Sequence, residues 1–175
     1  STNSRLLWVV AHDERVEKEG GRAASQPSWL MRVDRDTAGI PGLLPLVLDL
    51  PVRFTQEPDR GDRQKGVFTN ARDWLRGWSL KEEEEARIAA DPAVEVVLRW
   101  RPQHLYVELA SGNKALPLVD GKRIYALRCH CKSWYLDGDS RQVEIRRFGF
   151  PLVPDFGGTA HAYCGTSLDL SLIHI

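Results

Sequence analysis

Residues 157–165 hold the residue types of an anion-binding turn. Gly157-Gly158 permits a tight turn or a close backbone approach, Thr159 is of a type that caps helices, and Gly165 is of a type that ends them. His161 falls in the first turn of the predicted helix. Free N–H groups at such a helix start can bind a nucleic-acid phosphate. The local pattern by itself favours a plainer interpretation, a strand–turn–helix corner with His161 on a polar face.

A second candidate site is an alternating row of arginine and tryptophan. At a period of two residues, four side chains can share one face of a strand: Arg72, Trp74, Arg76 and Trp78. Indole rings stack on bases and guanidinium groups neutralise phosphates, so the row predicts contact with single-stranded DNA. The alternative is a surface row of arginines that covers partly buried tryptophans.

Cys129-His130-Cys131 invites a zinc interpretation, but its spacing argues against one. Structural zinc sites use C-x2–4-C pairs with a second pair elsewhere, whereas the spacing in this chain is C-x-C. We therefore predict two small buried thiols and no metal site. The sequence also holds no G-x-x-x-x-G-K-[ST] phosphate loop, no G-x-S-x-G elbow and no H-E-x-x-H helix. The chain is not expected to hold or hydrolyse ATP by itself.

Charge and composition restrict the partners and the compartment. Lys and Arg number 24, as do Asp and Glu, so bulk charge predicts no polyanion partner; a local basic excess runs from Glu95 to Phe150. No stretch approaches the ~20 apolar residues of a membrane span, so no membrane partner is expected. Three Cys, an odd number, and a start without a signal-peptide pattern predict an intracellular protein, nuclear or cytoplasmic and not secreted. The missing initiator Met predicts a fragment.

The distribution of apolar residues predicts an α+β, β-rich fold. Residues 6–11 are expected to form a buried strand that ends in a solvated His12-Asp13, and residues 14–43 to be mostly loop with a helical turn near 28–31. Residues 80–92 are expected to form a short helix whose four consecutive Glu face solvent. Further strands are expected at 46–48, 52–55, 67–69, 74–78, 94–101, 105–109, 124–136, 143–147 and 148–153.

Two segments resemble motifs of superfamily 1 DNA helicases of the PIF/RecD type. The first, Phe150-Pro151-Leu152 followed by Thr159-Ala160-His161, Gly165 and Leu168-Asp169, resembles the family's T-x-H-x-x-x-G motif near the C-terminus. The second resembles the segment that opens the family's inserted small β-barrel, and it comprises Leu44-Pro45-Leu46, Leu50 to Thr55, Asn70 and Trp78. Both segments occur in the family's order, and together they bracket residues 44–169.

The resemblance implies the C-terminal portion of an ATP-dependent DNA helicase, of a kind that acts in DNA repair and recombination. It implies part of a RecA-like domain at 1–43, an inserted SH3-like barrel region at 44–147 and a return to the RecA-like domain at 148–170, with a foreign tail at 171–175. Thr159, His161 and Gly165 would contact single-stranded DNA. ATP and Mg²⁺ would bind in the full-length protein, with an N-terminal RecA-like domain outside this chain.

Two alternatives remain open from the sequence. The first is a stand-alone β-rich module that binds nucleic acid or protein and has no motor. The second is a decayed, inactive copy of the helicase. A phosphate loop encoded upstream in the same reading frame would favour the helicase, and a start codon near Ser1 would favour the module.

Overall fold

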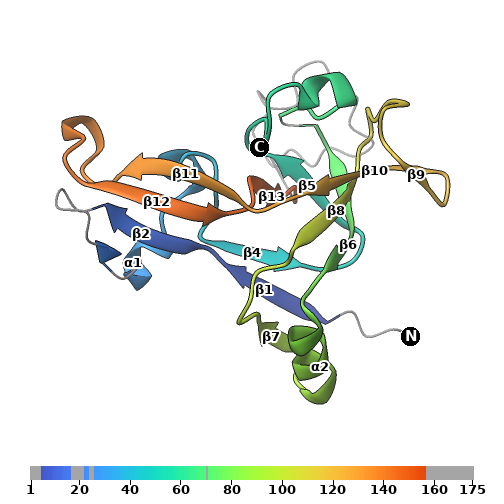
Figure 1. Ribbon diagram of the computed structural model, residues 1–175, viewed down its shortest axis with the longest axis horizontal. Helices are drawn as coiled ribbons and strands as arrows, with labels where there is room; N and C mark the ends of the chain where they lie inside the picture. Colours follow the sequence, from blue (N-terminus) through green and yellow to red (C-terminus); the bar gives the residue numbers. More distant parts are fainter. Residues whose placement is uncertain (1–4, 17–21, 24–25, 70, 157–175) are drawn as a thin grey trace, which may run out of the picture.

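The computed structural model describes residues 5–16, 22–23, 26–69 and 71–156, which form a β-rich α+β fold with three sheets (Figure 1). The helical elements are α1 (Pro27–Leu30), α2 (Glu82–Ala90) and the 3-10 turns η1 (Asp34–Thr37), η2 (Asp62–Lys65) and η3 (Gly138–Ser140). The strands are β1 (Leu6–Val10), β2 (His12–Val16), β3 (Arg22–Ala23), β4 (Leu43–Leu46), β5 (Leu50–Phe54), β6 (Asp73–Ser79), β7 (Glu95–Val97), β8 (His104–Glu108), β9 (Leu118–Val119), β10 (Lys122–Leu127), β11 (His130–Tyr135), β12 (Glu144–Gly149) and β13 (Leu152–Pro154).

The sheets differ in size and in strand direction. A three-stranded sheet has the order β4-β1-β7, a four-stranded sheet β11-β12-β2-β3, and a six-stranded sheet β13-β5-β6-β8-β10-β9. β1 runs parallel to β7, and the other pairings of the described strands are antiparallel. The strand expected at 6–11 is confirmed as β1, although burial alternates along it, with Leu7 and Val9 inside.

The chain changes sheets at two neighbouring points. β1 continues through Ala11 into β2, and β12 continues through Phe150-Pro151 into β13. The two points touch, because a Cβ on Gly149 would lie 3.5 Å from Ala11 Cβ and only 2.6 Å from Ile40 Cγ2. The strand expected at 148–153 is therefore divided between two sheets. The one expected at 124–136 is likewise divided, into β10 and β11.

One further strand expectation is corrected, and the expected helix is confirmed. Residues 67–69 form no strand and contribute only an isolated bridge between Thr69 and Phe54. The expected limits of the inserted region, at 43/44 and 147/148, fall inside β4 and β12. The helix expected at 80–92 is confirmed as α2, and Asp91-Pro92 follows its last residue.

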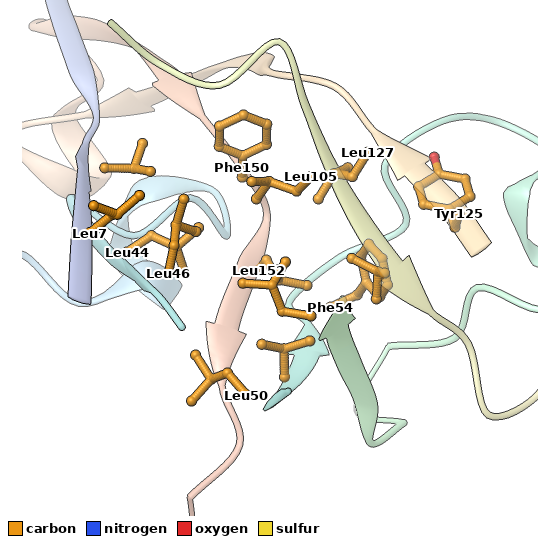
Figure 2. Close-up of a cluster of buried hydrophobic side chains, with 14 of the residues drawn as sticks. Leu7, Leu44, Leu46, Leu50, Phe54, Leu105, Tyr125, Leu127, Phe150 and Leu152 are labelled. Carbon is orange, nitrogen blue, oxygen red and sulfur yellow. The ribbon is translucent and has the colours of Figure 1, made fainter. Parts of the chain in front are cut away.

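One buried apolar cluster joins the three-stranded and six-stranded sheets. Phe150 and Leu152 lie between Leu7 and the other side chains of β1 and β4 on one side, and Phe54 and Leu105 of the six-stranded sheet on the other (Figure 2). Burying a side chain of this size contributes roughly 1.5–3 kcal/mol. A second cluster, Trp29, Trp134 and Ile145, packs α1 against the four-stranded sheet.

A buried ion pair holds the four-stranded sheet, and it overturns the expectation that Asp13 is a solvated strand end. Asp13 and Arg147 are both 0% exposed. Nε and Nη2 of Arg147 each donate to an Asp13 carboxylate oxygen at 2.7 Å. The same guanidinium donates to the backbone oxygens of Trp29 and Ile40 at 2.6 and 3.2 Å. His12, by contrast, is exposed as expected.

Asp73 gives the fold a distinctive pH dependence. The carboxyl is 1% exposed, its Oδ1 accepts the Ala110 N–H at 2.9 Å, and its Oδ2 has no hydrogen-bond partner among the described residues. Burial raises its pKa from 3.8 to about 7, against the opposing effect of the Ala110 hydrogen bond. Protonation therefore favours the folded state, and this stabilisation falls as pH rises from about 4 through about 7.

Asp73→Asn is expected to remove that dependence. Between about pH 5 and about pH 8, the melting temperature of the unsubstituted chain should fall by about 3–6 °C more than that of the variant. Thermal melts followed by circular dichroism at both pH values measure the difference. Equal changes in the two proteins would contradict this assignment.

Candidate nucleic-acid interface

The candidate site begins with an exposed tryptophan on a loop that is hydrogen-bonded at both ends. Residues 98–103 connect β7 to β8, and Trp100 in this loop is 52% exposed. On one side of it, the buried Leu98 donates its N–H to Trp8 O at 2.9 Å. On the other side, Gln103 donates its N–H to Ser79 O at 2.8 Å. The loop therefore holds about half of the Trp100 surface in solvent, where the indole ring is available for contact.

Cationic side chains surround Trp100. Lys81 places its Nζ 5.0 Å from the centre of the indole ring, within cation–π range. Arg101 lies over Phe148, with its Cζ 5.7 Å from the ring centre. Arg128 donates from Nε to His104 Nε2 at 3.3 Å. These groups come from the start of α2, the loop and the end of β10, so the tertiary fold brings them together.

Two hollows meet at Trp100 and Arg101. The first, of about 380 Å³, is lined by the end of β1, with His12, and by Leu98 to Arg101. The second, of about 460 Å³, is lined by Lys81, Trp100 to His104, Arg128 and Cys129. Among the described residues no carboxylate lines either hollow. We call the two hollows together the Trp100 groove; a groove with cationic and aromatic walls attracts phosphate and stacks bases.

A buried glutamate of α2 holds the backbone of the loop that carries Trp100. It also corrects the expectation that all four glutamates of α2 face solvent. Four exposed Glu were expected, but Glu84 is 1% exposed. Its Oε1 accepts the Arg99 N–H and an Arg87 N–H, each at 2.7 Å. The Arg87 bond and the Arg99 N–H hold the Glu84 pKa below its ordinary value. Glu82, Glu83 and Glu85 are exposed, as expected.

The predicted arginine–tryptophan row does not form one face. β6 and β8 pair Leu75 with Val107 and then Gly77 with Tyr106, so Arg76 is the extra residue of a β-bulge. The bulge turns Trp78 to the same side as the fully buried Leu75. There it packs against the main core, beside Leu7, Leu80 and Ile88. Trp74 remains on the outer side, opposite Glu108.

The two arginines of that row are engaged by acids. Arg76 pairs with both Glu108 and Asp49, and its Cζ lies 6.0 Å from the Trp74 ring centre. Arg72 precedes β6 and donates from Nε to Asp155 Oδ2 at 2.8 Å. A phosphate at Arg76 would therefore compete with two carboxylates, whereas no carboxylate in the described part of the chain lines the Trp100 groove. Neither Arg72 nor Arg76 lines that groove.

The other predicted site residues are placed differently or lie beyond the description. Thr159, His161 and Gly165 lie outside the described residues, as does Asn70. Cys131 is exposed and Cys129 partly buried, so the expectation of two buried thiols is wrong for Cys131. No group of three or more potential metal ligands is found among the described residues. No helix in the described part of the chain has the length and hydropathy of a membrane span.

Fold and site together define a β-rich α+β protein with an aromatic, cationic surface groove. No protein-family profile matches the sequence, and no curated protein sequence matches it. The structure is similar to the crystal structure of Pif1 helicase from Candida albicans, with a TM-score of 0.53 and 12% sequence identity. The alignment covers 93% of this chain and 32% of the helicase chain, so this chain corresponds to about a third of that protein. At this identity the likeness concerns the fold alone.

Proposed function

We propose that this chain is part of a PIF/RecD-type DNA helicase and that it binds single-stranded DNA in the Trp100 groove. The observation that carries the proposal is the exposed Trp100 between two hollows whose charged lining residues are all basic. Stacking on an aromatic side chain is worth roughly 1–3 kcal/mol per base and tolerates any sequence. Lys81, Arg101 and Arg128 would supply the phosphate contacts. Phosphate contacts do not depend on the base sequence, and a motor that moves along DNA needs contacts of this kind.

One parallel strand pair supports the RecA-like part of this proposal. β1 and β7 are parallel neighbours, and α2 leads directly into β7, as in α/β domains of the RecA type. We propose that this three-stranded sheet belongs to the RecA-like part and the six-stranded sheet to the inserted SH3-like barrel, which places β7 and β13 on the other side of the limits expected from the sequence. The T-x-H-x-x-x-G segment with Thr159 and His161 would add further DNA contacts and couple them to the nucleotide.

ATP and Mg²⁺ belong to the remainder of the proposed helicase. The absence of a phosphate loop from the sequence supports a nucleotide site outside this chain. In the proposed full-length protein, a further RecA-like domain would hold the nucleotide. This chain would hold the strand on which that domain acts.

Removing two cations from the Trp100 groove tests the electrostatic part of the proposal. Lys81→Gln together with Arg128→Gln should lower affinity for a labelled oligothymidine, because two phosphate contacts are lost. The slope of log K against log salt should become shallower by about 1.4, since each contact on a single strand contributes about 0.7. Fluorescence anisotropy at several salt concentrations measures both quantities.

A charge-matched control separates this effect from general electrostatics. Arg60 and Lys114 are exposed and line neither hollow of the Trp100 groove. Arg60→Gln with Lys114→Gln changes the net charge by the same amount and should leave the slope unchanged. The proposal fails if the two double variants behave alike, or if the unsubstituted chain binds duplex as tightly as single strands.

A further inference from the structure

The outer face of the six-stranded sheet carries a second aromatic surface next to the Trp100 groove. Successive outward residues of β8 are His104 and Tyr106, whose rings are stacked, with 6.2 Å between their centres and 14° between their planes. The core-facing residues of the same strand, Leu105 and Val107, are fully buried. The alternation of β8 therefore separates a hydrophobic inner side from an aromatic outer side.

The Tyr106 ring is not covered by bulky neighbours on the adjacent strands. The pairing register places Gly77 of β6 and Ala126 of β10 directly opposite Tyr106, one on each side. A Cβ added to Gly77 would meet only Tyr106 Cδ2, at 3.8 Å. Small residues on both neighbouring strands leave space around an aromatic ring on an open sheet face, which is the arrangement on which bases stack.

The stacked pair connects two hollows. His104 lines the second hollow of the Trp100 groove. Tyr106 lines the next hollow along the sheet, of about 460 Å³, with Ile124 and Val119 as its apolar wall. The charged residues of this hollow are two acids and two bases: Asp49, Asp120, Arg76 and Lys122. It thus offers stacking and apolar contact, but no net attraction for a phosphate.

We propose that single-stranded DNA bound at Trp100 continues over His104 and Tyr106, so that the outer face of the six-stranded sheet is a second base-stacking site. This inference rests on the proposed function of the Trp100 groove and adds a direction and an extent to it. The strand would run from the loop before β8 along β8 toward Trp74 (Figure 1). The Trp100 groove would provide stacking and phosphate contacts, and the Tyr106 surface would provide stacking alone.

Oligothymidines of two lengths test the extension. A chain of about 4 nucleotides can occupy one of the two sites, and one of about 12 can span both. Tyr106→Leu should weaken binding of the longer oligonucleotide by about 5- to 100-fold and that of the shorter one by less than about 2-fold. The salt slope should not change, because no charge is removed. Tyr106→Phe, which keeps the ring, should bind both lengths like the unsubstituted chain.

The outcomes separate this inference from the proposed function. If Trp100→Ala weakens both lengths while Tyr106→Leu weakens neither, or weakens both equally, the extension is overturned and the Trp100 groove stands. If Trp100→Ala and Lys81→Gln/Arg128→Gln have no effect, the proposed function itself fails. Melting temperatures of all variants, measured in parallel, exclude unfolding as the cause of a lost affinity. Loss of affinity in Tyr106→Phe equal to that in Tyr106→Leu would also overturn the stacking role.

Discussion

Arg147→Met should destabilise the fold more than any other single substitution that we propose. It removes the cation from a fully buried ion pair and leaves the Asp13 carboxylate buried without it. It also removes the donor to Trp29 O and Ile40 O. Breaking a buried pair from one side costs about 3–5 kcal/mol. For a chain of this size, that corresponds to a fall of about 6–20 °C in melting temperature.

Two comparisons make this result specific to the pair. Arg35→Met removes an arginine whose ion pair with Asp36 is exposed, and it should change stability by less than about 0.5 kcal/mol. The double variant Asp13→Leu/Arg147→Met buries no unpaired charge and should melt closer to the unsubstituted chain than Arg147→Met does. A loss below about 1 kcal/mol in Arg147→Met would contradict the buried pair. Thermal and urea unfolding followed by circular dichroism give the values.

Trp100→Ala should produce the largest single-residue loss of DNA affinity. The indole is half exposed and lies against Lys81 Nζ, so its removal takes away a stacking surface and frees the cation that it positions. The expected loss is roughly 1–3 kcal/mol, or about 5- to 150-fold in dissociation constant. Because Trp100 carries no charge, the salt slope should stay the same, in contrast to the Lys81/Arg128 double variant.

Two matched variants serve as controls for this prediction. One replaces Trp100 with another aromatic residue, and the other removes an aromatic residue outside the groove. Trp100→Tyr keeps a stacking ring and should recover most of the affinity. Phe68 is exposed and lines neither hollow of the groove, so Phe68→Ala should bind like the unsubstituted chain. Anisotropy titrations with one labelled oligothymidine compare the three variants. Equal affinities in Trp100→Ala and Phe68→Ala would exclude the groove as a stacking site.

Local patterns in the sequence predicted most elements and missed the features that depend on pairing. The strand β1 was expected from its apolar run, and α1 and α2 from short helical patterns. The strands β2 and β3 were not expected, because residues 14–43 are charged and small and were predicted to be mostly loop. The bulge at Arg76 was not, because one extra residue on β6 is defined only by its partners on β8. That single residue moved Trp78 from the expected outer face to the core-facing side of the sheet, where it is partly buried. The sheet change between β10 and β11 was missed for the same reason.

The charged residues were misplaced where their partners are distant in the chain. Asp13 was expected in solvent because nothing adjacent to it predicts Arg147, and Glu84 because three exposed Glu surround it. For the Trp100 groove, the run Arg99-Trp100-Arg101 was expected to end a strand at 94–101, but β7 ends at Val97 and the run lies in the following loop. Pro102 was the usable signal, because proline disfavours a continuing strand. Lys81 and Arg128 join the groove only through the tertiary fold.

The crossing of the chain between sheets beside Gly149 ties the stability of all three sheets together. One crossing strand pair comes from the start of the described chain, and the other from its end, and each contributes to two sheets. A cut at Ala11 would remove β1 from the three-stranded sheet, and a cut at Phe150 would remove β13 from the six-stranded sheet. The three sheets should unfold in one cooperative step, with their central amides opening to hydrogen exchange only through global unfolding. Under the proposed function, a force applied to DNA in the Trp100 groove would reach β1 through the hydrogen bond from the Leu98 N–H to Trp8 O.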